Sequence, residues 1–344
     1  MGINALKNEK FSKKSIPKIF NKIFLILLKR SIMKNILVIR DLVKNYGSFL
    51  ALDGFTCNIP KGVTGLLGPN GAGKTTFIRA VLGIHPFKSG EINFLDYKLP
   101  EDLLAVKDKI GYQPEVDTRI LNTSAMKYVT HMATMAGLSR NTAKQRAFDT
   151  LHYVGLGEAR YRDMNTFSQG MMQKVKLATA LVHDPLFLLL DEPTAGCDPD
   201  SHEQILDLIS DLGRNHGKNI LISTHLLPDV ERTASSVVVM NLGKTVIQGD
   251  LRSILHKEDR IINLQVRVNG DINKFAKLLQ DNGFEVTNIA EMISLNVERE
   301  DDKKYLSIFN LARNNGMNIR MMTAYQQSLE DVFLDEIAKN QMEN

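Results

Sequence analysis

The feature that most constrains the fold is a glycine-rich octapeptide at residues 68–75, Gly-Pro-Asn-Gly-Ala-Gly-Lys-Thr. It follows an apolar run at residues 63–67 and precedes a helical pattern that starts at Thr76. A G-x-x-x-x-G-K-[ST] sequence between a strand and a helix is typical of a loop that binds phosphates through inward-facing backbone N–H groups and the helix N-terminus. We expect Lys74 to reach the β- and γ-phosphates and the Thr75 hydroxyl to coordinate Mg²⁺. A purely structural glycine-rich turn is the alternative.

The predicted nucleotide-binding residues of this loop are Gly68, Pro69, Asn70, Gly71, Ala72, Gly73, Lys74, Thr75 and Thr76.

Short apolar runs alternate with longer helical stretches over the first two thirds of the chain. The runs, at residues 36–39, 63–67, 186–190, 220–223 and 237–240, are apolar throughout rather than alternating. This pattern predicts parallel strands that are covered on both faces. Residues 123–184 carry Met, Ala and Leu at helical spacing, so we expect a helical insertion over about residues 115–184 of an α/β nucleotide-binding domain that ends near Asp250.

The last ninety or so residues have a different pattern. Ile262, Leu264, Val266 and Val268 alternate with polar residues, which predicts a half-buried strand. A helix to residue 279, strands at 284–289 and 292–297, a helix at 303–313, a strand at 317–322 and a last helix at 329–338 follow. The order β-α-β-β-α-β predicts a small ferredoxin-like α+β domain. We therefore divide the chain into an extension (1–33), a nucleotide-binding domain (34–252) and an accessory domain (253–344).

The formal net charge of +4 is unevenly distributed. Residues 1–34 contain 9 Lys and Arg and 1 acidic residue, or +8, and the remaining 34 basic and 38 acidic residues give −4. Ile16, Ile19, Phe20, Ile23 and Leu27 follow helical spacing in this basic segment, so it could lie on an anionic membrane. The favoured alternative is an incidental extension with Met33 as the natural start. A body at −4 indicates no basic groove for nucleic acid.

Apolar-run length and cysteine content exclude two classes of protein. The longest clean apolar run is six residues, 23–28, against about 20 needed to cross a bilayer, so we expect a soluble or peripheral protein. The 2 cysteines, Cys57 and Cys197, cannot form a disulfide framework or a cysteine-rich metal site. We interpret them as reduced thiols in a cytosolic protein.

Polar residues end two of the apolar runs. Asp191 and Glu192 follow the run at residues 186–190, where buried carboxylates favour a nearby cation. Asp191 is the predicted Mg²⁺ partner and Glu192 the group that polarises the attacking water. His225 follows the run at residues 220–224 and can donate to the γ-phosphate. Helix-capping acids and a structural histidine are the alternatives.

Together these motifs resemble the ATP-binding subunit of an ABC transporter over about residues 36–250. The resemblance implies that Tyr46 stacks on adenine and that Gln113, in Gly-Tyr-Gln-Pro, is the Gln loop residue that touches Mg²⁺ and water. His225 corresponds to the switch histidine. The signature lies at Phe167-Ser168-Gln169-Gly170-Met171, and the D-loop at Gly196-Cys197-Asp198-Pro199.

The sequence departs from the family's common motifs at two positions, and it also resembles one branch of the family. Gln169 replaces the commonest glycine of the signature, and Cys197 replaces an aliphatic D-loop residue. Neither removes a charged group. The Ser-Gln-Gly-Met form resembles the branch that serves ABC-2 type exporters, and residues 328–334 resemble its C-terminal ending more weakly.

The resemblance implies an ATPase with ATP and Mg²⁺ as ligands, at the cytoplasmic face of the membrane. Two copies, or one copy and a paralogue, would enclose ATP head to tail, with Ser168, Gly170 and Asp198 completing the partner's site. A separate permease is expected to dock between the Gln113 region and the helical insertion. The alternative is a soluble ABC-type ATPase that acts on ribosomes or nucleic acid, although such proteins tend to have tandem domains, heptads or a basic face. A ligand-sensing role for the small domain is a further alternative to dimer support.

Overall fold

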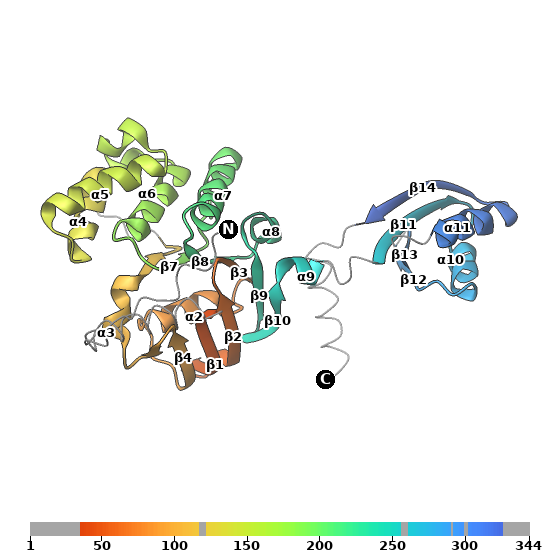
Figure 1. Ribbon diagram of the computed structural model, residues 1–344, viewed down its shortest axis with the longest axis horizontal. Helices are drawn as coiled ribbons and strands as arrows, with labels where there is room; N and C mark the ends of the chain where they lie inside the picture. The colour runs from red at the N-terminus through yellow and green to blue at the C-terminus, as the bar shows by residue number, and fades with distance from the viewer. Residues whose placement is uncertain (1–34, 117–121, 256–260, 290–291, 299–301, 326–344) are drawn as a thin grey trace, which may run out of the picture.

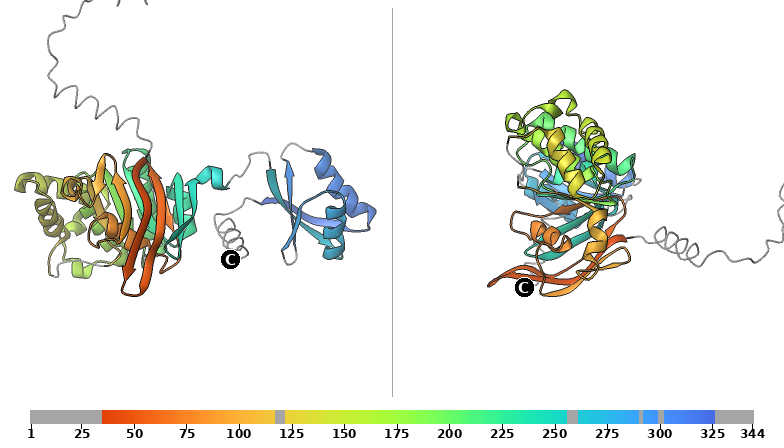
Figure 2. Two further views of the ribbon diagram at one scale, coloured as in Figure 1. Left: turned by 90° about the horizontal axis from the view of Figure 1, so that it is seen from below. Right: turned by 90° about the vertical axis from the view of Figure 1, so that its left-hand side faces the viewer.

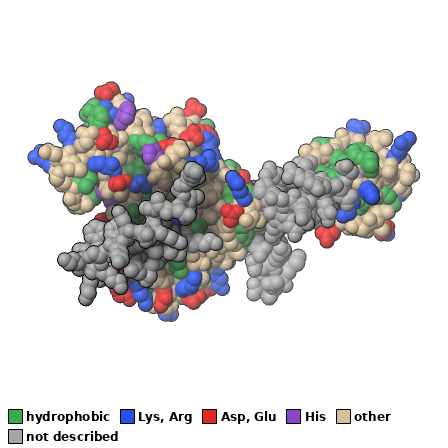
Figure 3. All heavy atoms as spheres, in the orientation of Figure 1, with side chains coloured by type: hydrophobic (Ala, Val, Ile, Leu, Met, Phe, Trp, Pro, Cys, Tyr) green, Lys and Arg blue, Asp and Glu red, His purple; other side chains and the backbone are tan. Residues whose placement is uncertain are grey.

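The computed structural model describes residues 35–116, 122–255, 261–289, 292–298 and 302–325 (Figure 1). The basic extension, the predicted helix at 329–338 and the C-terminal ending at 328–334 lie outside the described residues. Among the helices within these ranges, none is both long and apolar enough to cross a membrane. On the face shown in Figure 3, basic and acidic side chains are interspersed over the described surface.

A six-stranded sheet in the order β10-β9-β3-β8-β7-β6 forms the centre of the nucleotide-binding domain. Its strands are β3 (Val63–Leu67), β6 (Ile110–Gln113), β7 (Phe187–Asp191), β8 (Asn219–Thr224), β9 (Ser236–Asn241) and β10 (Lys244–Asp250). All neighbours pair in parallel except β10, which is antiparallel to β9. Four of the five predicted parallel strands are therefore confirmed.

Strand β7 explains why the apolar runs are continuous. Leu188 and Leu190 pack into one hydrophobic cluster, and Phe187 and Leu189 pack into another. Successive side chains of a strand point to opposite faces, so a sheet covered on both sides needs apolar residues at every position.

The prediction of a parallel strand at residues 36–39 is wrong. These residues belong to β1 (Asn35–Tyr46), which pairs antiparallel with β2 (Phe49–Pro60) and with β4 (Ser89–Phe94). With β5 (Tyr97–Leu99) they form a second sheet in the order β2-β1-β4-β5. Four consecutive apolar residues indicate a buried strand, but strand direction depends on partners that are distant in sequence.

The helical insertion is confirmed. It contains α4 (Ala125–Met135), α5 (Arg140–Tyr153) and α6 (Gln169–Leu181), with short 3-10 helices at Gly157–Tyr161 and Met164–Thr166. Serine side chains cap all three α-helices, at Ser124, Ser139 and Ser168. The other helices of the domain are α2 (Lys74–Val81), α3 (Leu103–Val106), α7 (Pro199–Arg214), α8 (Leu227–Thr233) and α9 (Leu251–Leu255).

The C-terminal elements follow the predicted β-α-β-β-α-β order. They are β11 (Ile261–Asn269), α10 (Ile272–Asp281), β12 (Val286–Ile289), β13 (Met292–Glu298), α11 (Asp302–Asn314) and β14 (Asn318–Tyr325). The sheet order is β12-β13-β11-β14, with every pair antiparallel, so one strand separates the first two strands of the unit. Both helices lie on one face of this sheet (Figure 2), over a hydrophobic cluster of its own.

The parallel sheet decides where a site can form. In a parallel sheet the carboxyl ends of the strands meet at one edge, which is the usual place for a ligand in an α/β fold. The glycine-rich loop follows β3, Gln113 ends β6, Asp191 ends β7, and His225 follows β8. The predicted residues are therefore brought to the same edge.

The packing of Phe94 against Phe187 joins the two sheets of the domain and leads to a stability prediction. Their ring centroids are 5.9 Å apart and both side chains are fully buried. Phe187→Ala is expected to lower the free energy of unfolding by about 3–5 kcal/mol, because it leaves a cavity between the sheets. Denaturant unfolding measures this loss. Leu104→Ala, at a residue that is 85% exposed, is the control and should change stability by less than about 0.5 kcal/mol. Equal losses in the two variants would contradict the assignment of this core.

Candidate phosphate-binding and hydrolytic site

The glycine-rich loop forms a cradle at the start of α2. Gly71 and Gly73 have φ values of +83° and +107°, which favour glycine. A Cβ added at Gly68 would lie 2.3 Å from the Met240 carbonyl oxygen, so the backbone packs too closely there for a side chain. A cavity of about 300 Å³ is lined by residues 69–76, together with Phe49, Ala51, Glu115 and Glu192.

Lys74 is a buried cation with three partners. Its Nζ donates to the carbonyl oxygens of Gly68 (2.7 Å) and Pro69 (3.3 Å). The same Nζ lies 3.4 Å from Glu192 Oε1, and each side chain is less than a tenth exposed. A buried ammonium requires such partners, because its desolvation is otherwise costly.

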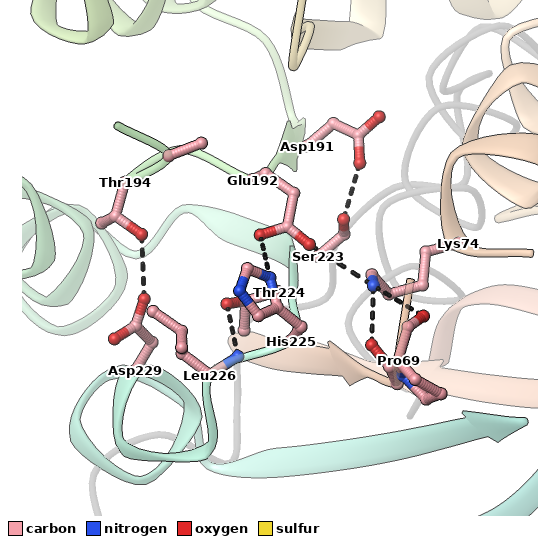
Figure 4. A network of polar contacts seen from close by, with 12 residues as sticks. Pro69, Lys74, Asp191, Glu192, Thr194, Ser223, Thr224, His225, Leu226 and Asp229 are labelled. Atoms are coloured by element: carbon pink, nitrogen blue, oxygen red, sulfur yellow. Dashed lines mark hydrogen bonds and ion pairs between the residues drawn. The ribbon is translucent and has the colours of Figure 1, made fainter. Parts of the chain in front are cut away.

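Glu192 lies between Lys74 and His225 (Figure 4). Its Oε2 lies 3.0 Å from His225 Nδ1, while its other oxygen contacts Lys74. The carboxylate therefore joins the cradle to the end of β8. A carboxylate held in this way beside a phosphate-binding loop can orient and polarise a water molecule.

Asp191 has one satisfied and one unsatisfied oxygen. Oδ1 accepts a hydrogen bond from Ser223 Oγ at 2.6 Å, and Oδ2 is buried without a hydrogen-bond partner among the described residues. A buried, unpartnered carboxylate oxygen fits a hard divalent cation, which prefers oxygen ligands. Thr75, the other predicted Mg²⁺ ligand beside the cradle, lines its cavity.

Gln113 is at the predicted edge, but its amide contacts the helical insertion. Its Nε2 donates to Gln173 Oε1 of α6 at 2.9 Å, and both side chains are fully buried. Its Oε1 is buried without a hydrogen-bond partner in the described part of the chain. Among the described residues, no side-chain hydrogen bond or ion pair joins Gln113 to Asp191 or Glu192.

The aromatic residue that lines the cavity is not the one expected from the sequence. Phe49 lines the cavity, whereas Tyr46 is not among its lining residues. Tyr46 instead packs edge-on against His85, with ring centroids 5.6 Å apart. Tyr46 and Phe49 are paired across the β1–β2 turn. The sequence signal for Phe49 is therefore that it is a second aromatic residue, three positions after Tyr46.

The signature and D-loop residues lie outside this cavity. Ser168 Oγ accepts from the Met171 N–H at 3.3 Å, so Ser168 is the N-cap of α6. Gly170 packs against α7, where a Cβ would lie 2.3 Å from Ser201 Oγ. Asp198 caps α7 by accepting from the Ser201 N–H and hydroxyl, which lowers the pKa of its carboxyl. Ser168 and Asp198 are both exposed residues.

The two residues that depart from the common motifs, Gln169 and Cys197, have different surroundings. Gln169 lies against the D-loop, since a Cβ on Gly196 would be 3.1 Å from Gln169 Cγ. Cys197 is a half-buried free thiol whose pKa is raised, chiefly by burial. Cys57 is a fully buried free thiol whose pKa is likewise raised by burial.

Comparisons with known proteins agree with this geometry. The family described as "ABC transporter" matches residues 52–195. The chain is 30% identical to the uncharacterized ABC transporter ATP-binding protein YxlF of Bacillus subtilis, over 87% of this chain and 98% of that protein. It is 28% identical to the linearmycin resistance ATP-binding protein LnrL of the same organism, over 86% and 96%. The structure of cbiO1 from Clostridium perfringens, part of the ABC transporter complex cbiONQ, aligns with a TM-score of 0.58 and 29% identity, covering 64% of this chain and 91% of that one.

Lys74→Ala is expected to weaken binding of a fluorescent ATP analogue by at least 10-fold, because it removes the buried cation of the cradle. Equilibrium titration measures the dissociation constant. Lys98→Ala removes an exposed lysine paired with Glu91 and serves as the control, with unchanged affinity. Wild-type affinity in Lys74→Ala would contradict the assignment of the cradle.

Proposed function

The chain belongs to the ABC transporter ATP-binding proteins, and we propose that within this family it is the ATP-hydrolysing motor subunit of an exporter. As a member, it is a nucleotide-binding ATPase of the ABC type. The observation that carries the hydrolytic assignment is the position of Glu192, which contacts the cradle lysine through one oxygen and His225 through the other.

In the proposed mechanism the chain first orients the triphosphate. Backbone N–H groups of residues 69–73 and the N-terminus of α2 face the phosphates, and Lys74 exchanges its contact with Glu192 for contacts with the β- and γ-phosphates. Thr75, Asp191 and Gln113 would hold Mg²⁺, the last two through carboxylate and amide oxygens that have no hydrogen-bond partner among the described residues. Bound there, Mg²⁺ supplies positive charge against the phosphate oxygens.

Glu192 then acts on the attacking water. Its carboxylate accepts a hydrogen bond from the water and so directs the lone pair toward the γ-phosphorus. His225 donates to a γ-phosphate oxygen as negative charge grows on it.

A second copy, or a paralogue, completes each site in this proposal. Ser168 is exposed at the N-terminus of α6, where free N–H groups and the helix dipole attract an anion. The cradle of the same chain already binds phosphate at α2. The two anion sites are therefore both used when two chains lie head to tail, with Ser168, Gly170 and Asp198 of each chain against the other's nucleotide.

The proposed partner is an ABC-2 type permease, with this chain bound at the cytoplasmic face of the membrane. LnrL is named for linearmycin resistance, and removal of a toxic compound is one way to confer resistance. YxlF is named an ABC transporter ATP-binding protein and cbiO1 part of an ABC transporter complex, which favours a transporter over an ATPase that acts on ribosomes or nucleic acid.

Glu192→Gln tests the hydrolytic assignment. The amide keeps the size of the side chain but cannot accept the proton of water, so the ATPase rate is expected to fall roughly 10²-fold or more. ATP binding should persist, and ATP-bound dimers should accumulate on size exclusion with Mg²⁺ present. Wild-type turnover together with only monomers would overturn this assignment.

Mixed dimers test the shared site. Ser168→Arg places bulk and positive charge where the partner's γ-phosphate would bind, so this variant alone should bind nucleotide but fail to hydrolyse it. Mixing it with Lys74→Ala subunits pairs an intact cradle with an intact signature and should restore part of the activity. Heterodimers that form but stay inactive would contradict the head-to-tail arrangement.

A further inference from the structure

Glu192 has an unfavourable backbone conformation. Its φ is +47°, in the left-handed region, and Pro193 follows it. A residue with a long side chain rarely adopts this region, and a following proline disfavours helical conformations further. Such a conformation persists only where neighbouring contacts hold it in place. The Glu192 N–H donates to the Ser223 carbonyl at 3.0 Å, which holds the residue on its β8 side.

On the other side, Asp229 holds Thr194. The Thr194 hydroxyl donates to Asp229 Oδ2 at 2.9 Å, and Asp229 is 2% exposed. The second oxygen of Asp229 lies 2.8 Å from His202 Nε2 on α7. Asp229 belongs to α8, which begins directly after the His225 segment. The contact between Thr194 and Asp229 therefore runs beside the contact between Glu192 and His225 (Figure 4).

Gln173 holds the next residue, Ala195. Its Nε2 donates to the Ala195 carbonyl oxygen at 3.0 Å, and its Oε1 accepts from Gln113 Nε2. A carbonyl oxygen can only accept, so the orientation of the Gln173 amide is determined, and that of Gln113 follows from it. Lys176, one turn further along α6, donates to the carbonyl oxygens of Pro114 and Glu115. Helix α6 thus binds both the Gln113 segment and the segment after Glu192.

We propose that Asp229 and Gln173 are positioning residues that keep Glu192 in its left-handed conformation by holding Thr194 and Ala195. Neither residue lines the cavity of the cradle. They act on hydrolysis through Glu192, so the inference rests on the proposed role of that carboxylate. Asp229 links α8, which begins just after His225, to the backbone that follows Glu192. Gln173 does the same for α6, whose N-cap is Ser168.

Thr194→Val tests the Asp229 contact. Valine keeps the shape of threonine but leaves Asp229 Oδ2 without its donor. We expect kcat for ATP hydrolysis to fall roughly 10-fold or more, since small displacements of a reacting group have effects of this size. KM and the dissociation constant for ATP should stay within about 2-fold, because the cradle is unchanged. Thr194→Ser keeps the hydroxyl and should restore kcat.

Gln173→Met is a second, independent test. Methionine has a similar length but cannot donate to Ala195, so the same selective loss of kcat is expected. Gln145→Met makes the same chemical change at an exposed residue of α5 and should leave kcat unchanged. Melting temperatures identify variants that lose activity by unfolding.

The decisive comparison repeats both substitutions in the Glu192→Gln background. If they act only through the Glu192 carboxylate, they should not lower the residual single-turnover rate further. A further 10-fold loss there, or wild-type kcat in Thr194→Val and Gln173→Met, would overturn the inference while leaving the proposed function intact. Wild-type turnover of Glu192→Gln itself would overturn the proposed function and this inference with it.

Discussion

The buried ion pair between Lys74 and Glu192 connects the two halves of the site. Lys74 begins α2 after the glycine-rich loop, and Glu192 follows the last residue of β7. Each charge is almost fully removed from water, so each would be costly without the other. In the proposed function, a phosphate group offers Lys74 an alternative partner, and the Glu192 oxygen that Lys74 contacts would then be free to accept a hydrogen bond from a water molecule. Binding and hydrolysis would be coupled through one carboxylate.

The packed layers of the domain hold the Lys74–Glu192 pair in place. Strand β7 is buried on both faces, with alternate residues in two hydrophobic clusters, so its carboxyl end is a rigid support for Asp191 and Glu192. On one side of the sheet, α6 carries Ser168 at its exposed end and Gln173 in its buried middle. This helix therefore links two places: the surface at Ser168, which we propose to contact another chain, and the backbone beside Glu192.

Much of the fold was predictable, and the errors have a physical cause. The helical insertion, the small C-terminal unit and four of the parallel strands follow from periodicity, which is a property of neighbouring residues. The strand at residues 36–39 was assigned to the wrong sheet, because its antiparallel partners β2 and β4 contribute nothing to its local pattern. Phe49, which lines the cavity, has a sequence signal, because it is a second aromatic residue three positions after Tyr46. Gln173, Thr194 and Asp229, which we propose to act on Glu192, have none, because glutamine, threonine and aspartate are common and no spacing rule marks them.

What the sequence by itself determined is the chemistry carried by contiguous segments. The glycine-rich loop, the two carboxylates after an apolar run and the histidine after another need only local structure to be identified. The tertiary structure alone decided that one oxygen of Glu192 contacts Lys74 while the other contacts His225, and that Gln113 turns its amide to α6. Those contacts join strands and helices that are far apart along the chain, and they exist only because the sheet brings the carboxyl ends of its strands together and packing fixes each buried polar group against a partner.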